Sequence, residues 1–357
     1  RVLQQLDSLT DGKVLEQTRL MTGASGGMIG AAYIRELFLK QKLGQSDALW
    51  QRKYADRIAK DLLNRVCFKI VTGLFLPTAT ERVGASHYFS DRGWSFDDQL
   101  IRNLGVFQDR RLCEYIDLEE QAIIPQMIFS PIVINDGRKM YISSMPVSYL
   151  MRYRNYDGDL DEAITGVDFR RFFRSQDADS LLFATALRMN ASFPLITPYV
   201  RMPSDPPIQV IDAGVADNYG LETASRYLQT FADWYLENTD GVLLLQIRDS
   251  KAQSEEVPEY HRKNLLRQFL DPIGATYSAF SLSSDLANEQ HIHAMDQHMK
   301  GRLEYACFQY EPVDSGGIRA ALSWHLTQKE IDGIEASLHN EANTAVFEQV
   351  RAYLKVE

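Results

Sequence analysis

A short pattern near the start of the sequence places a reactive side chain among small residues. It is Gly23-Ala24-Ser25-Gly26-Gly27, a GXSXG pattern that follows a β-like run and precedes a helix-like run. A serine on a sharp strand-to-helix turn needs small neighbours, because the backbone is strained and the helix must pack close beneath it. The helix that begins at Gly26 would also point unpaired N–H groups at the serine. The pattern predicts an exposed, nucleophilic Ser25, although a glycine-rich packing turn is the alternative.

A serine hydroxyl needs a base to take its proton, and Asp212 is our candidate for that base. It follows a short expected strand over residues 209–211, and the active sites of open α/β sheets form at the carboxyl ends of strands. Ala213 and Gly214 come next and leave room for close approach. The alternative interpretation of this aspartate is an acidic turn residue or a helix cap.

The elements expected around these residues alternate between helices and strands. Helical spacing of apolar residues predicts helices over residues 2–9, 28–39, 180–189, 222–235, 285–300 and 327–355. Strands are expected over residues 19–22, 209–211, 241–247 and 303–310. This alternation favours an α/β fold whose central, mainly parallel sheet is flanked by helices.

Residues 41–175 break the alternation, and we expect them to form a large insertion or cap within one domain of residues 1–357. Helices are expected there over 47–66 and 96–104. An Asp-Gly turn at 136–137 between β-rich runs over 126–134 and 139–143 predicts a hairpin. The apolar stretch at 68–76 fits a core helix better than a lipid-facing surface, and both interpretations remain open.

The composition narrows the class of protein. The 357 residues are 45% hydrophobic and 24% charged, so the chain can bury a sizeable core. A net charge of −10 without a basic patch argues against a nucleic-acid partner. Three scattered cysteines are expected to be reduced, buried thiols. The longest apolar runs fall well short of the roughly 20 residues that a spanning helix needs. The sequence favours a cytoplasmic or membrane-associated protein and does not specify its oligomeric state.

Three segments together resemble the patatin-like phospholipase family. They are Gly23-Ala24-Ser25-Gly26-Gly27, Ala191-Ser192-Phe193-Pro194 before a proline-rich loop, and Asp212-Ala213-Gly214-Val215-Ala216-Asp217-Asn218. The resemblance covers about residues 1–40 and 180–250. It implies a patatin-like α/β fold and a Ser–Asp dyad that hydrolyses lipid acyl esters through an acyl-enzyme, with no metal, cofactor or histidine. A lipid or a membrane interface is then the expected partner.

The resemblance also assigns roles residue by residue. Ser25 falls on the nucleophile of the family, with Gly23, Gly26 and Gly27 as its elbow, and Asp212 falls on the aspartate. The family usually has Asp-Gly-Gly or Asp-Gly-Ala at that point, whereas Asp212 precedes Ala213 and Gly214. The small residues of the aspartate motif are thus kept.

An oxyanion hole is the part of the family pattern that the sequence does not contain. The resemblance implies a glycine-rich loop before the first helix. Because a helix that feeds a parallel strand is normally the second half of a βαβ unit, we expect that loop and a strand before Arg1. Gly26 and residues 315–319 (SGGIR) are the next candidates, with a surface turn as the simpler interpretation of the latter.

Two other functional interpretations remain open. One is an α/β-hydrolase triad, in which Ser25 and Asp212 would be completed by a later histidine; the candidates are His261, His291 and His325. The other is a binding or scaffold domain of the same fold without turnover.

Two patterns with metal-ligand residues do not predict a metal site. His291 and His298 share a helix face but lie about 10 Å apart along its axis, too far for one ion. The acidic run at 157–161 begins like a calcium loop, but Glu162 stands where that loop needs a glycine. We therefore expect neither a metal nor a cofactor.

Overall fold

The computed structural model describes residues 1–73, 80–83, 86–89, 91–154, 160–192, 199–250, 287–311 and 326–356. Its helices are α1 (Val2–Leu9), α2 (Lys13–Gln17), α3 (Ser25–Lys42), α4 (Arg52–Ile58), α5 (Leu63–Gly73), α6 (Arg92–Leu104), α7 (Ile116–Glu120), α8 (Phe169–Phe172), α9 (Phe183–Asn190), α10 (Leu221–Asn238), α12 (Gln328–Leu338) and α13 (Glu341–Tyr353). Residues 287–298 are also helical. Its strands are β1 (Leu20–Thr22), β2 (Thr80–Val83), β3 (Ser86–Phe89), β4 (Gln126–Ile128), β5 (Ile132–Val133), β6 (Lys139–Tyr141), β7 (Arg152–Arg154), β8 (Leu160–Ile164), β9 (Gly166–Asp168), β10 (Val200–Arg201), β11 (Gln209–Ile211), β12 (Val242–Arg248) and β13 (Leu303–Gln309).

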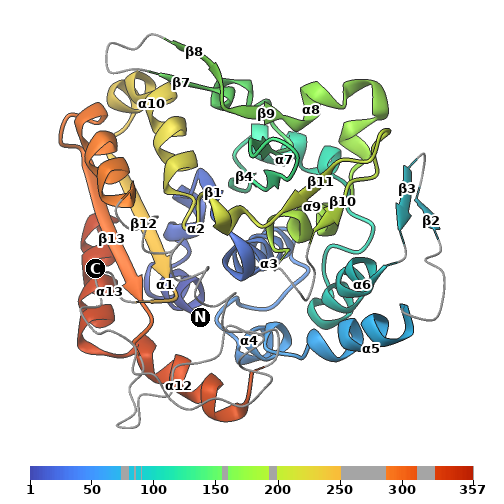
Figure 1. Ribbon diagram of the computed structural model, residues 1–357. Coiled ribbons are helices and arrows are strands. Elements are labelled where there is room, and N and C mark those ends of the chain that lie inside the picture. Colours follow the sequence, from blue (N-terminus) through green and yellow to red (C-terminus); the bar gives the residue numbers. More distant parts are fainter. Residues whose placement is uncertain are drawn as a thin grey trace, which may run out of the picture.

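The strands pair in both directions among surrounding helices, which makes this an α/β protein (Figure 1). β1 pairs in parallel with β4, and β12 pairs in parallel with β13. A five-stranded sheet in the order β10-β11-β5-β6-β9 is antiparallel except for its last pair, β6 and β9. Because the described strands form separate ladders, a single central and mainly parallel sheet stays a prediction.

Several expected elements are observed at or near their predicted bounds. The helix over 2–9 is α1, and the strand over 19–22 is β1. The long helices expected over 47–66 and 327–355 are each divided into two. In each case a side chain caps a new helix start, because Asp61 accepts a hydrogen bond from the Asn64 N–H (3.0 Å) and Asn340 accepts one from the Asn343 N–H (2.7 Å).

The hairpin expected around the Asp-Gly turn is present, but it is shorter than predicted. β5 and β6 pair in antiparallel fashion, and Gly137 takes a left-handed conformation with φ of 74°. The expected first strand is divided, since Pro131 lacks an N–H to donate and separates β4 from β5. β4 pairs instead with β1.

Helix α3 lies at the centre of the molecule, surrounded by other elements (Figure 1). Its buried residues include Arg35, which is fully buried and forms an ion pair with Glu119. The Arg35 guanidinium also lies over the ring of Tyr115, 4.4 Å from its centroid. These contacts compensate the charge of an arginine inside the core and hold α3 in place.

Two expectations about burial are wrong. The apolar stretch at 68–76 was expected in the core, but the side chains of Phe68 and Val71 on α5 are 68% and 59% exposed. Its residues 74–76 lie outside the described residues. The three cysteines are free, but Cys67 and Cys113 are exposed instead of buried. Among the described helices, none has the length and hydrophobicity needed to cross a bilayer.

Candidate active site

Ser25 lies on the turn between β1 and α3, as the sequence predicts. It is the first residue of α3, and its φ of 52° places it in the left-handed region. That conformation is uncommon for a residue with a side chain and marks local strain. Ala24 before it and Met28 after it are buried, whereas Ser25 is partly exposed and Gly26 is exposed. The turn therefore presents the serine hydroxyl at the surface of a packed core.

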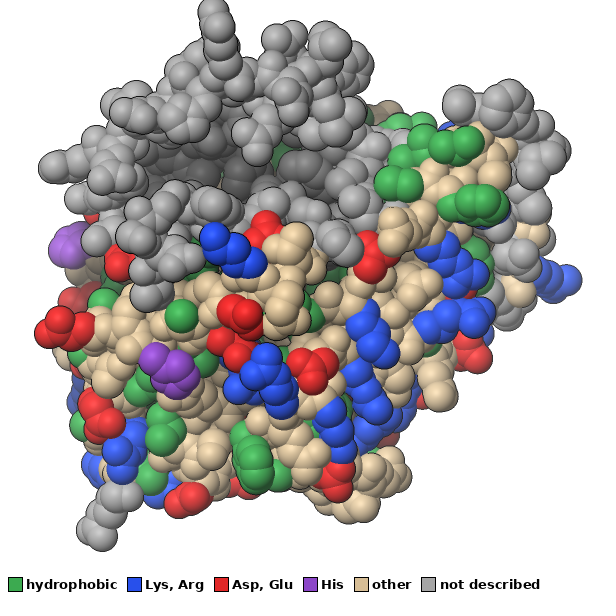
Figure 2. All heavy atoms as spheres, turned by 90° about the horizontal axis from the view of Figure 1, so that it is seen from below, with side chains coloured by type: hydrophobic (Ala, Val, Ile, Leu, Met, Phe, Trp, Pro, Cys, Tyr) green, Lys and Arg blue, Asp and Glu red, His purple; other side chains and the backbone are tan. Residues whose placement is uncertain are grey.

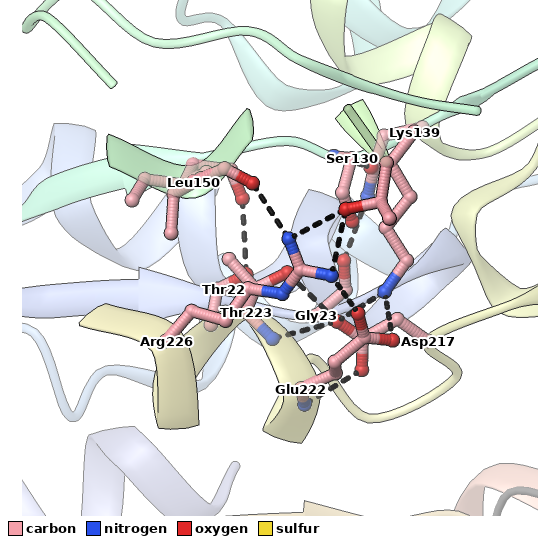
Figure 3. Close-up of polar contacts among 12 residues, drawn as sticks. Thr22, Gly23, Ser130, Lys139, Leu150, Asp217, Glu222, Thr223 and Arg226 are labelled. Atoms are coloured by element: carbon pink, nitrogen blue, oxygen red, sulfur yellow. Dashed lines mark hydrogen bonds and ion pairs between the residues drawn. The ribbon is translucent and has the colours of Figure 1, made fainter. Parts of the chain in front are cut away.

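Side-chain contacts from Thr22 and Asn190 hold this turn in place, and Figure 3 shows Thr22, Gly23 and Ser130 among them. The Thr22 hydroxyl donates to the Ile128 carbonyl (3.1 Å) on β4. Asn190, fully buried at the end of α9, donates from Nδ2 to the Gly23 carbonyl (3.0 Å) and accepts from the Ser130 N–H (2.9 Å) at Oδ1. Since both ends of its amide are satisfied, Asn190 positions the turn between two elements.

Asp212 follows β11 directly and is 5% exposed. Its Oδ1 accepts a hydrogen bond from the Gly214 N–H (2.7 Å). Burial raises the pKa of Asp212 to about 7, and hydrogen bonds from Gly214 and from the Ser25 side chain offset part of that rise. The Ser25 contact is loose, because Oδ2 makes no hydrogen bond of ordinary geometry. Contacts of this kind commonly tighten only when substrate binds.

The loop after Asp212 approaches the serine turn so closely at Gly220 that no side chain fits there. A methyl group at Gly214 would lie 3.0 Å from Asp212 Oδ1 and 3.6 Å from Ala24 Cβ. Gly220 has φ of 71°, and a methyl group there would lie 2.5 Å from the Gly23 nitrogen. The backbone of this loop thus rests directly on the turn that carries Ser25. In contrast, a methyl group at Gly27 would meet nothing within 4 Å.

A buried ionic cluster fixes the same loop to β6 and α10 (Figure 3). Asp217 caps α10 by accepting hydrogen bonds from the Thr223 N–H (3.0 Å) and hydroxyl (2.7 Å). Lys139 Nζ lies 3.4 Å from Asp217 Oδ2 and 2.5 Å from Glu222 Oε2. Arg226 pairs with the other oxygen of Glu222 at 2.8 Å. Burial acts to raise the pKa of Glu222, but the charges of Lys139 and Arg226 lower it to about 2, so Glu222 is ionised.

Sequence reasoning missed Asn190, Gly220 and this cluster. Gly220 carried only a general signal, since glycine takes a positive φ without steric cost. Ser192 of the second motif is fully buried, while Phe193 and Pro194 lie outside the described residues. Residues 315–319 also lie outside them.

The histidines that would complete a triad do not show a link to Asp212 in the described part of the chain. His261 and His325 lie outside it. His291 lies near the ionic cluster, and its pKa is lowered mainly by burial. The groups that set the pKa of Asp212 include no histidine among the described residues.

His291 and His298 of the first metal-like pattern lie on the described helical residues 287–298, whereas the second pattern is only partly described. Between them, His293 is exposed and its Nε2 lies 2.8 Å from Gln297 Nε2. In the second, residues 157 and 159 lie outside the described residues, and Asp161 is exposed on β8. Across the described ranges, no group of three or more His, Cys, Asp or Glu side chains is arranged to hold a metal ion.

Comparison with known protein families gives a match that includes both candidate residues. A model of the patatin-like phospholipase family matches residues 1–225. The matched part contains both Ser25 and Asp212, and it includes the expected insertion between them. No curated protein matches the chain.

The close contact at Gly220 gives a stability prediction. Gly220→Ala forces a methyl group against the backbone of the serine turn and puts a side chain at positive φ, so we expect it to lower the free energy of unfolding by about 2–4 kcal/mol. Gly27→Ala is the matched control, since that site is open, and it should change stability by less than about 0.5 kcal/mol. Urea unfolding measures both variants. Equal stabilities would show that the loop does not rest on the turn.

The raised pKa of Asp212 gives a second prediction. Burial raises it from 3.8 to about 7, so between these values the folded protein binds more protons than the unfolded chain. The free energy of unfolding therefore falls as the pH rises through this window. Asp212→Asn removes the titration, and we expect the variant to be more stable than the parent by up to about 4 kcal/mol at pH 8 and by less at pH 5. A stability difference that does not change between urea titrations at the two pH values would contradict this.

Proposed function

Since the chain belongs to the patatin-like phospholipase family, we propose that it is a lipid acyl hydrolase in which Ser25 is the nucleophile and Asp212 the general base. One observation carries the proposal. The serine lies at positive φ on a strand-to-helix turn, and its side chain makes a loose contact with a buried carboxyl whose pKa is raised to about 7. A base of that pKa is about half ionised at pH 7 and largely ionised at pH 8, yet basic enough to accept a proton.

The reaction follows from these two side chains. The Asp212 carboxylate accepts the Ser25 proton as Oγ attacks the acyl carbon, and the protonated Asp212 then donates to the leaving alcohol. Ser25 is left acylated. A water that gives its proton to Asp212 attacks the acyl carbon, and the fatty acid leaves as Oγ recovers a proton. No group beyond the dyad and water is needed for this proton balance.

Negative charge develops on the acyl oxygen in both steps and needs hydrogen-bond donors. The first N–H groups of a helix have no partner within the helix, and at α3 these belong to the residues around Gly26 and Gly27. Both glycines are exposed, so a substrate oxygen can approach their backbone. The N-terminal end of the α3 dipole favours the same charge. We propose these N–H groups as oxyanion donors.

We also propose that residues 1–357 form one catalytic domain around a central, mainly parallel sheet, with residues 41–175 as a large insertion. The parallel pairing of β1 with β4 and of β12 with β13 supports the proposal of a mainly parallel sheet. Within the insertion, β4 pairs with the strand that leads to Ser25, and β5 pairs with the strand that leads to Asp212. The insertion therefore adjoins both halves of the site.

The dyad is tested by a mutant cycle. Ser25→Ala and Asp212→Asn should each lower kcat about 10⁴-fold on a water-soluble acyl ester, and the double variant should be little worse, because nucleophile and base act as one unit. Ser8→Ala and Asp240→Asn, at exposed positions, should leave kcat unchanged. Independent, additive losses would refute the dyad.

The two alternative functions predict other outcomes of the same experiment. We expect no single histidine substitution to lower kcat by more than about tenfold, whereas a triad histidine would cost about 10⁴-fold. An inactive scaffold domain would leave Ser25 unlabelled by a fluorophosphonate probe under conditions that label a control hydrolase. Labelling of the parent but not of Ser25→Ala supports the enzyme.

The pKa of Asp212 predicts the pH dependence of the reaction. The base acts in its ionised form, and with a pKa of about 7 only about 1% of it is ionised at pH 5. We expect kcat/KM for a neutral ester to rise with pH by about tenfold per unit up to a midpoint near pH 7, and then to level. Initial rates between pH 5 and 9 measure this. A flat profile from pH 5 to 8 would exclude a base with this pKa.

A further inference from the structure

Helix α5 carries apolar side chains on two opposite faces. Val66 is fully buried and Ile70 packs against the core, which forms the inner face. Phe68 and Val71 are 68% and 59% exposed, and because they are three residues apart they share the outer face. A helix at a protein surface normally has polar residues on its outer face. The side chains of Phe68 and Val71 thus contribute little to the core, although burying them would be energetically favourable.

Basic side chains outnumber acidic ones in the segment that carries this outer face. Residues 52–71 contain Arg52, Lys53, Arg57, Lys60, Arg65 and Lys69 against Asp56 and Asp61, a net charge of +4 in a chain whose total is −10. Two guanidinium groups share the carboxylate of Asp98. Arg65 lies 2.5 Å from its Oδ2, and Arg102 lies 3.0 Å from its Oδ1. Lys60 and Lys69 have no carboxylate partner among the described residues. Arg52, Lys53 and Arg65 are paired with carboxylates, so within the described part of the chain the unpaired positive charge near α5 includes that of Lys60 and Lys69.

Figure 2 shows the same arrangement on the molecular surface. Hydrophobic side chains gather at one side of the view, the side on which α5 lies in Figure 1, and basic side chains gather beside them. The apolar face belongs to α5, and the basic group spans α4, α5 and α6. Local positive charge next to exposed apolar side chains is the surface that an interfacial helix presents to anionic lipid.

We propose that α5 docks this protein on an anionic lipid surface, with Phe68 and Val71 among the acyl chains and Lys60 and Lys69 at the phosphate groups. This inference rests on the proposed lipid hydrolysis, because an enzyme with such a substrate must reach a lipid interface. A symmetric dimer through the same face fits less well. In a two-fold contact, α5 would meet its own copy, and the unpaired positive charges would face each other.

Vesicle sedimentation with the full chain carrying Ser25→Ala tests the docking surface without degrading the lipid. We expect stronger binding to phosphatidylcholine vesicles that contain phosphatidylglycerol than to pure phosphatidylcholine. Each lysine near an anionic surface contributes about fivefold to partitioning, so Lys60→Gln/Lys69→Gln should lower binding by roughly 25-fold. Phe68→Ser/Val71→Ser should lower it at least tenfold. Trp234→Ser, at a side chain that is 58% exposed on α10, is the matched control and should bind as the parent does.

The outcomes separate this inference from the proposed chemistry. With Ser25 present, the Phe68→Ser/Val71→Ser variant should hydrolyse a water-soluble ester within twofold of the parent rate, which also shows that it folds. Equal vesicle binding by parent and variant would overturn the docking surface, as would a variant that loses dimerisation but not vesicle binding. Failure of the parent to cleave any acyl ester would overturn the proposed function instead, whatever the vesicles show.

Discussion

The site depends on the contact between Gly220 and the backbone of Thr22 and Gly23. Ser25 and Asp212 lie far apart in the sequence, and this contact brings the loop of one against the turn of the other. Because nothing larger than a hydrogen atom fits between the two backbones, their separation is fixed by van der Waals contact and does not depend on flexible side chains. Asn190 holds the serine turn on one side, and the ionic cluster of Asp217, Lys139 and Glu222 holds the loop on the other.

The packing that assembles the site also lowers the stability of the folded protein. A carboxyl that is 5% exposed with one unsatisfied oxygen costs folding free energy whenever it is ionised. Positive φ at Ser25 adds local strain. Both costs arise at the residues for which we propose chemistry. The hydrogen bonds of Asn190 and the ionic cluster around Lys139 hold the neighbouring structure in place. The burial of Asp212 lowers the stability of the folded state and raises the pKa of the carboxyl toward neutrality, so this cost and the basicity of Asp212 have one origin.

The sequence predicts this site where the signal is local and misses it where the signal is tertiary. The turn around Ser25, the strand before Asp212 and helix α1 follow from spacing and small residues within a short window. Asn190 and Lys139 give no such signal, because a buried polar residue is identified only by its partners. Asp61 and Asn340 divide long helices by capping, which periodicity alone does not detect. Phe68 has the hydrophobicity of a core residue but not its position.

The backbone at Ser25 also restricts which residue can serve there. Threonine carries the same hydroxyl, but its branched Cβ is strongly disfavoured at φ of 52°. Serine has a single γ substituent and can take that conformation at a smaller cost. A threonine nucleophile would thus require a different turn conformation between β1 and α3. The backbone conformation at this turn therefore disfavours threonine on steric grounds alone.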